Sequence, residues 1–321
     1  MSRPVVALVA LSCALSVGLL FAGCGNSGRS SSPSCAGTEP TSSKDTLQSS
    51  TDTLQSLAGP SPIAVVPGTE DFQLGRNRYS FLIIDEQSRA VSTRTACVWV
   101  ATGLKRVPYE RTVARSEPIG VRGGAVAPVG SIYVVHVDLP KPGKYWLLAV
   151  PAGSSKPIGA LANLVVAAKP VGPPRVGGRA IASQTPTLAS TGGKLTALTT
   201  ATHPDPRLYR VSVAQALAAH MPFVVTFATP RFCTSRTCGP VVDVVDAVAK
   251  KLSASPVRFI HVEVYEANDP AKGFNRWFKQ WNLSTEPFTF VVDRRGVIRA
   301  KLEGAFSVGE LEQTVRATLL R

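Results

Sequence analysis

The chain has 321 residues, of which 44% are hydrophobic, and 35 basic against 21 acidic residues give it a formal net charge of +14. A chain of this length predicts about two folded domains, because domains commonly hold roughly 100–200 residues. The basic residues are spread along the chain without long runs, which argues against a nucleic-acid-binding stripe. We therefore expect a basic surface near anionic lipid or envelope polymer, and no nucleic-acid partner.

The N-terminal residues decide the expected compartment. An apolar stretch runs from Val5 to Phe21 and ends at Leu-Phe-Ala-Gly-Cys, residues 20–24. These residues resemble the signal of bacterial lipoproteins. The resemblance implies a signal peptide over 1–23, a lipid on Cys24, and a protein anchored to the extracytoplasmic face of the cell membrane. A plain transmembrane anchor is the alternative, although the stretch is marginally short for the roughly 20 residues that a spanning helix needs.

Residues 24–60 are rich in Ser, Thr and Gly and predict a disordered tether, because they are too polar to build a core. Export places the folded parts where disulfides persist. Cys13 leaves with the signal peptide, whereas Cys35 lies in the tether and Cys97 in an expected strand. These last two cysteines either pair with each other or remain as a free thiol and a buried core residue.

Residues 61–168 predict an all-β, Ig-like sandwich, because short apolar runs alternate with turn residues at hairpin spacing. The segment 137–145 loosely resembles a hairpin of bacterial Ig-like modules, which implies a binding or spacer domain. The expected strands lie at 63–66, 79–84, 96–100, 132–137, 145–150 and 160–166. Residues 169–207 are rich in Pro, Gly and Thr and predict a linker.

From residue 208 onward the pattern changes to alternating strands and helices. Apolar runs predict strands, and Pro240 fits a helix start because its missing N–H is not needed there. Residues 271–281 predict a second helix with an aromatic side. In chain order, the expected elements are strand 222–228, a helix from 240, strand 257–264, helix 271–281, strands 288–292 and 297–302, and helix 308–320.

This region resembles the membrane-anchored, thioredoxin-like oxidoreductases of bacterial envelopes. The resemblance rests on the strand leading into Cys233, on Glu-Pro-Phe-Thr-Phe at 286–290, and on Asp-Arg-Arg-Gly-Val at 293–297. It implies an α/β thioredoxin-like C-terminal domain over 208–321, with Cys233 as the attacking thiol and Cys238 as the resolving thiol. It also implies that Pro287 is a cis-proline that docks the substrate strand.

The spacing of the two cysteines departs from the Cys-x-x-Cys pattern of that family. Residues five apart lie about 7.5 Å apart along a regular helix, at ~1.5 Å per residue, whereas disulfides join Cα atoms roughly 4.4–6.8 Å apart. A loop must therefore precede a helix that begins near Gly239, or the first helical turn must unwind on oxidation. Arg231 and Arg236 add positive charge that favours a thiolate. The family's buried acid has no counterpart, and Thr226 lies near its place.

Other functions remain open for this cysteine pair. A peroxiredoxin of the bacterioferritin-comigratory type also uses Cys-x4-Cys, but here Pro230 stands where its pattern needs Thr. A copper chaperone would need a distant histidine, and neither His220 nor His261 is well placed. A non-enzymatic binding lipoprotein with a structural disulfide is the remaining class. We expect an extracytoplasmic thiol–disulfide oxidoreductase that acts on thiol and disulfide proteins, with no cofactor and no metal.

Overall fold

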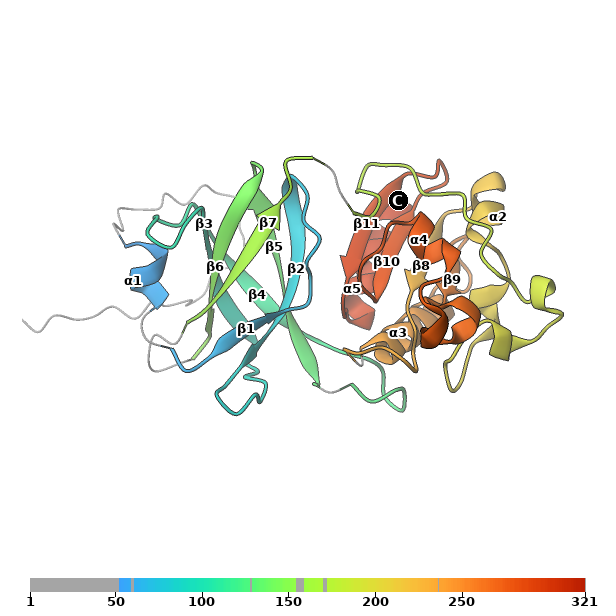
Figure 1. Cartoon of the computed structure of the whole chain (residues 1–321), viewed down its shortest axis with the longest axis horizontal. Helices are drawn as coiled ribbons and strands as arrows, with labels where there is room; N and C mark the ends of the chain where they lie inside the picture. The colour runs from blue at the N-terminus through green and yellow to red at the C-terminus, as the bar shows by residue number, and fades with distance from the viewer. Residues whose placement is uncertain are drawn as a thin grey trace, which may run out of the picture. The chain divides into compact units, whose positions relative to one another are not determined.

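The structure is a computed structural model that describes residues 52–58, 61–127, 129–153, 159–169, 172–235 and 237–320, all of them within one compact unit. The predicted signal peptide, the lipidated Cys24, most of the tether and Arg236 lie outside the described residues. Two separate β-sheets organise the described chain (Figure 1). No helix in the described ranges is long and apolar enough to cross a membrane.

The first sheet has seven strands in the order β1-β2-β5-β4-β3-β6-β7, and every neighbouring pair is antiparallel. The sheet curls until its two edges approach, because Phe72, which follows β1, forms a parallel bridge with Val166 in β7. The strands are β1 Ala64–Pro67, β2 Gly75–Ile84, β3 Thr95–Ala101, β4 Glu110–Pro118, β5 Ser131–Leu139, β6 Gly143–Pro151 and β7 Ala160–Val166.

Successive side chains of these strands point to opposite faces of the sheet, and apolar side chains gather on both faces. Tyr79 and Phe81 of β2 are fully buried on one face, where the Phe81 ring stacks on Tyr133 at 5.4 Å. Part of the other face, on β3 and β6, is covered by helix α1 (Leu54–Ala58), whose Leu54 packs with Trp99. The end of the segment that we expected as a tether is therefore folded, because Leu54 supplies an apolar anchor among polar residues.

The second sheet has four strands in the order β11-β10-β8-β9. Only the β8–β9 pair is parallel, and β10 runs antiparallel to both β8 and β11. Its strands are β8 Phe223–Phe227, β9 Arg258–Val262, β10 Phe288–Val292 and β11 Ile298–Glu303. Strands β8 and β10 are buried at every position, which explains their unbroken apolar runs in the sequence.

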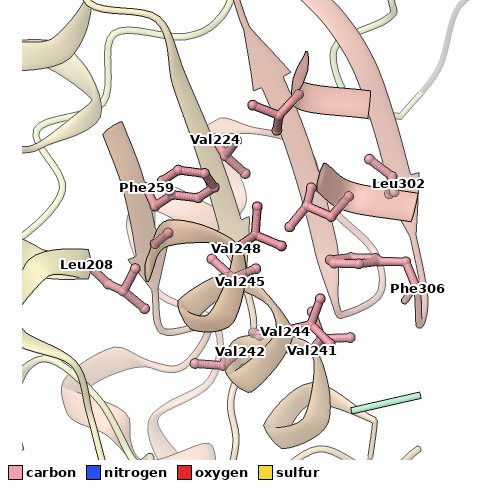
Figure 2. Close-up of a cluster of buried hydrophobic side chains, with 14 of the residues drawn as sticks. Leu208, Val224, Val241, Val242, Val244, Val245, Val248, Phe259, Leu302 and Phe306 are labelled. Carbon is pink, nitrogen blue, oxygen red and sulfur yellow. The ribbon is translucent and has the colours of Figure 1, made fainter. Parts of the chain in front are cut away.

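Helices lie on both faces of this sheet. On one face, α3 (Cys238–Lys251) packs with α5 (Val308–Leu319), and the expected apolar side of α3 is confirmed, since Val241, Val244, Val245 and Val248 are all buried. Figure 2 shows these valines grouped with Val224 of the sheet. The other face is packed by α2 (Val213–Ala218), α4 (Arg276–Gln280) and a cluster around Trp281, whose ring lies 4.7 Å from Phe290.

The predicted fold class is wrong for this chain. We expected an α/β thioredoxin-like C-terminal domain plus an N-terminal all-β Ig-like sandwich. The described chain is instead mostly β, with one seven-stranded antiparallel sheet that nearly closes on itself, one small four-stranded sheet and few helices. A sandwich needs two packed sheets, whereas the first seven strands form a single sheet.

Two segments explain the error. Strand β4 joins the two halves of the first sheet, but its sequence Glu-Arg-Thr-Val-Ala-Arg-Ser-Glu-Pro is mostly polar and only Ala114 is buried, so it carries no apolar signal. The helix expected over 271–281 shrinks to α4, five residues long, because Pro270 and Gly273 belong to a short 3-10 turn and Asn275 caps the helix only afterwards. The aromatic spacing had suggested a longer helix.

The expected linker runs in 3-10 turns, at Ala189–Thr191, Leu195–Ala197 and Pro206–Tyr209, and it packs beside the second sheet. Its Ser183 is buried and accepts a hydrogen bond from the indole of Trp281 at 2.9 Å, while the Gln184 carbonyl accepts one from the indole of Trp277 at 2.7 Å. This segment therefore has fixed polar contacts despite its Pro, Gly and Thr content.

Candidate functional site

Cys233 and Cys238 form a disulfide, with their Cα atoms 5.9 Å apart. Cys233 lies in the loop after β8, and Cys238 is the first residue of α3. The loop alternative that follows from the spacing is thus confirmed: a bend precedes a helix that begins within one residue of Gly239. Pro240 falls in the first helical turn, where its missing N–H leaves no hydrogen bond broken.

The two sulfur atoms differ in their surroundings. Cys233 keeps 8% of its surface exposed, whereas Cys238 is completely buried. On the outer side, the Ser235 hydroxyl lies 3.2 Å from the Cys233 sulfur and 2.8 Å from the Thr237 hydroxyl. Cys233 is therefore the sulfur that an outside thiol reaches first.

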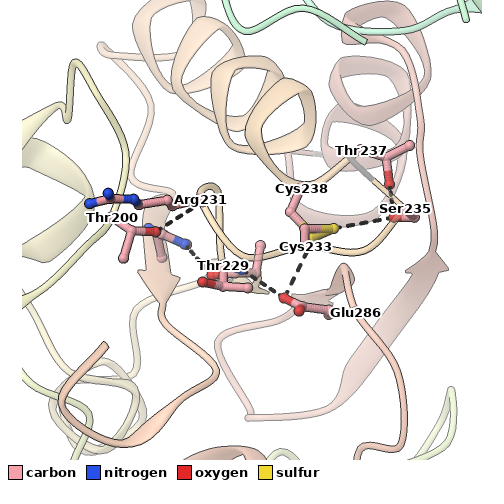
Figure 3. Close-up of a disulfide and its surroundings, with 10 residues drawn as sticks. Thr200, Thr229, Arg231, Cys233, Ser235, Thr237, Cys238 and Glu286 are labelled. Carbon is pink, nitrogen blue, oxygen red and sulfur yellow. Dashed lines mark hydrogen bonds between the residues drawn. A yellow bond between two sulfur atoms is a disulfide. The ribbon is translucent and has the colours of Figure 1, made fainter. Parts of the chain in front are cut away.

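Glu286 is the residue that the sequence reasoning missed. Its Oε2 atom accepts a hydrogen bond from the Thr229 backbone at 2.7 Å and lies 3.5 Å from the Cys238 sulfur (Figure 3). Glu286 stands directly before Pro287, and the peptide bond between them is cis, as the family resemblance implied. The resemblance implies a buried acidic residue on strand β8, close to where Thr226 stands. The structure instead places an acidic side chain near the sulfur atoms from the segment before β10.

Burial raises the pKa of the Glu286 carboxyl to about 7, and the negative charge of Glu263 acts in the same direction. The hydrogen bond from the Thr229 backbone works against this shift, because it favours the charged form, but it is the smaller effect. A carboxyl group therefore titrates near neutral pH within hydrogen-bond reach of the buried sulfur.

A second buried polar cluster lies beside the end of β8. The His261 Nε2 atom donates to the Ala228 carbonyl at 2.9 Å, so Nδ1 accepts from the Tyr209 hydroxyl at 2.7 Å. Burial lowers the pKa of His261 and keeps it neutral. Since both ring nitrogens have protein partners, His261 is not free to act as the distant histidine of a copper site.

Glu263 neighbours this cluster. Its Oε1 atom accepts hydrogen bonds from the Thr200 hydroxyl at 2.7 Å and from the Thr200 backbone. The buried Asn275 donates to the Glu263 carbonyl at 2.6 Å and caps α4 by accepting from the Phe278 backbone at 2.9 Å. These bonds tie the expected linker and α4 to the strand that ends near the disulfide.

The remaining predicted site residues form no hydrogen bond with either sulfur atom in the described part of the chain, or lie outside it. Thr226 is buried in β8 and shares a hydrogen bond with Thr289 of β10 at 2.9 Å, a cross-strand contact rather than a contact with either cysteine. Arg231 is exposed, and Figure 3 shows its side chain leading away from the disulfide. Pro287 is buried next to Glu286. Arg236 and Cys24 lie outside the described residues.

Metal-ligating atoms come together once among the described residues. One atom each from Cys233, Cys238 and Glu286 lies within 4.8 Å of the other two. The cluster coincides with the disulfide site, so both thiol chemistry and metal binding would use the same side chains. The sequence signal that could have located Glu286 is its place next to Pro287, in the segment already singled out for its proline.

The chain matches no protein-family model, and comparison with curated proteins gives no match either. The chemistry of this site therefore has to be argued from its own residues.

Proposed function

We propose that the protein is an extracytoplasmic thiol–disulfide oxidoreductase that uses the Cys233–Cys238 pair. One observation carries the proposal: a disulfide at the junction of a buried strand and a helix N-terminus has one sulfur near the surface and the other buried beside a carboxyl group. A purely stabilising role is less favoured, since a cross-link between residues five apart closes a very short loop and removes little chain entropy.

The proposed reaction is two successive thiol–disulfide exchanges. A substrate thiolate attacks the Cys233 sulfur, the Cys233–Cys238 bond breaks, and the Cys238 sulfur leaves with the electron pair and takes up a proton. A second substrate thiolate then attacks the substrate sulfur of the mixed disulfide and releases Cys233. The substrate dithiol becomes a disulfide, and the protein gains two electrons and two protons. The reverse sequence reduces a substrate disulfide.

The start of α3 favours this chemistry. The helix is 14 residues long and carries no acidic residue in its first turn. Its N-terminal N–H groups and dipole stabilise negative charge on a sulfur at this end, which makes a thiolate a better nucleophile and leaving group at neutral pH. The Glu286 carboxyl lies where it can exchange a proton with the Cys238 sulfur.

The cysteines also support the proposed compartment. Cys97, Cys233 and Cys238, which are the cysteines in the described ranges, are all disulfide-bonded. Disulfides persist outside the cytoplasm. We accordingly propose a lipid anchor on Cys24, and thiol or disulfide proteins of the envelope as substrates. The mature protein should carry a lipid on Cys24, seen as a mass increase, and the Cys24→Ala protein should carry none. A mature protein without this lipid would overturn the anchor.

The proposed activity is tested with a fluorescent peptide disulfide and glutathione as the electron donor. The Cys238→Ser protein should accumulate a mixed disulfide on Cys233, seen as a mass increase of one peptide, because the resolving thiol is missing. The Cys233→Ser protein should form none and should lose turnover. Full turnover by the Cys233→Ser protein would overturn the proposal. The Thr234→Ala protein, changed at an exposed position of the same loop, is the matched control and should turn over the peptide disulfide like the parent chain.

A further inference from the structure

The disulfide site holds a third potential metal donor beside its two sulfur atoms. Glu286 reaches the site from the segment before β10, far along the chain from the loop that carries Cys233. Its carboxylate is held in place by the Thr229 backbone, which belongs to the strand end from which that loop starts. The three donors are therefore brought together by the sheet rather than by a single flexible loop.

One spacing among these donors already fits a tetrahedral metal site. With Zn–S bonds of about 2.3 Å and a Zn–O bond of about 2.1 Å, a tetrahedral zinc ion places a sulfur and an oxygen ligand about 3.6 Å apart and two sulfur ligands about 3.8 Å apart. The Cys238 sulfur and Glu286 Oε2 already lie 3.5 Å apart. After reduction, the Cys233 sulfur would have to move from its bonded position to about 3.8 Å from the Cys238 sulfur to complete the set.

We propose that the reduced protein binds one Zn²⁺ through the thiolates of Cys233 and Cys238 and the carboxylate of Glu286. This combination of two thiolates and a carboxylate suits Zn²⁺, whereas Cu(I) prefers soft thiolate or thioether ligands and gains little from a carboxylate. Three protein ligands leave one tetrahedral position for water or an outside thiolate. The disulfide removes both thiolates, so zinc binding and oxidation exclude each other, and zinc keeps the pair reduced.

The test uses the full-length protein, reduced with a phosphine, freed of reductant and metal, and titrated with Zn²⁺ against a chromophoric chelator. The reduced protein should bind one ion per chain, at least 100-fold more tightly than the oxidised protein. The Glu286→Gln protein should bind at least 10-fold more weakly. The Glu303→Gln protein is the matched control, because it alters a buried carboxyl group of β11 outside the donor set, and it should bind like the parent chain.

Equal affinity of the reduced and oxidised forms would overturn the site, and unchanged affinity in the Glu286→Gln protein would remove the carboxylate from it. If that variant does not fold, Co²⁺ added to the reduced parent protein decides instead. Intense tetrahedral bands with thiolate charge transfer support the site, and a weak octahedral spectrum overturns it. Peptide-disulfide turnover without zinc binding would defeat this inference alone, whereas zinc binding with full turnover by the Cys233→Ser protein would defeat the proposed function alone.

Discussion

The two sheets use cysteine in different ways. In the seven-stranded sheet, Cys97 lies inside strand β3, is 2% exposed and packs in an apolar cluster with Leu54 and Trp99. Beside the four-stranded sheet, Cys233 lies in the loop after β8 and Cys238 is the first residue of α3. The titratable Glu286 lies next to this pair. A cysteine within a strand is held in place by its neighbours, whereas a pair at a loop and a helix start has room to open.

Buried ionisable groups follow the same division. The second sheet buries His261 and Glu263 and half-buries Glu286, all on elements that end near the disulfide. The core of the first sheet is built from aromatic and aliphatic side chains such as Tyr79, Phe81 and Tyr133. The first sheet thus contributes mainly packing, whereas the second gathers buried ionisable groups near the disulfide, and variants in each sheet should separate stability from the proposed activity.

The largest expected difference is between Cys233→Ser and Cys97→Ser. Loss of the attacking thiol should lower peptide-disulfide turnover about 1,000-fold or more, because no other group in the site can form the mixed disulfide. Loss of Cys97 should leave turnover intact and lower the free energy of unfolding by about 2–5 kcal/mol, the usual cost of removing a native disulfide. Turnover and urea unfolding are measured on both variants. Lost turnover in the Cys97→Ser protein with normal turnover in the Cys233→Ser protein would contradict the proposed difference between the two sheets.

The next largest effect concerns the core under the second sheet. Trp281 is completely buried between Phe227 at 5.2 Å and Phe290 at 4.7 Å. We expect Trp281→Ala to cost about 3–5 kcal/mol in urea unfolding, because it leaves a large cavity. Val126→Ala is the control, since Val126 is 90% exposed, and it should leave stability unchanged. A small cost at Trp281 would mean that this core is loosely packed.

A smaller effect is expected at Asn275, which joins α4 to strand β9. Asn275→Ala removes a helix cap and leaves the Glu263 carbonyl without its donor, for a combined cost of about 2–3 kcal/mol. Asn275→Ser keeps a capping oxygen but loses the donor, so its cost in thermal or urea unfolding should be smaller. Equal costs for the two variants would show that the cap contributes nothing.

The smallest effect is a change in pH dependence at His261. Burial lowers its pKa in the folded protein, so its contribution to stability is present above the unfolded pKa of about 6.5 and is lost as the pH falls below it. This group alone should lower the free energy of unfolding by at most about 1.4 kcal/mol per pH unit as the pH falls through that range. The His261→Gln protein should show a shallower slope, and the exposed His220→Gln should not. Equal slopes in all three proteins would mean that the pKa of His261 is the same in the folded and unfolded protein.

Local patterns predicted individual elements better than their assembly. Six of the first seven strands were expected, because each carries an apolar run, but the polar β4 was not, and without it the strands suggested two sheets instead of one. The helical face of α3 was predictable from its valine spacing. The helix expected around Phe274 was too long, because aromatic spacing outweighed the signals of Pro270 and Gly273.

The candidate site shows the same limit. The family resemblance implied the pairing of Cys233 with Cys238, which the structure contains. The position of the helix start follows from the spacing, since a five-residue separation cannot be bridged along a regular helix. The contact of Glu286 with the site could not be predicted from spacing, because it depends on strand β10 lying next to β8. Thr229 and Glu286 are 57 residues apart in the chain. Thr226 was considered in the place of the missing acid, but its hydroxyl is used by Thr289.

The reduction potential of the Cys233–Cys238 pair tests the central claim most directly. It is measured by equilibrating the full-length protein in glutathione buffers of known ratio, with Cys97→Ser as a second sample to isolate the pair. A redox-active pair at a helix N-terminus should have a potential between about −270 and −120 mV, the range of known exchange proteins. A potential below about −300 mV would contradict the account, because the bond would then resist reduction as structural disulfides do.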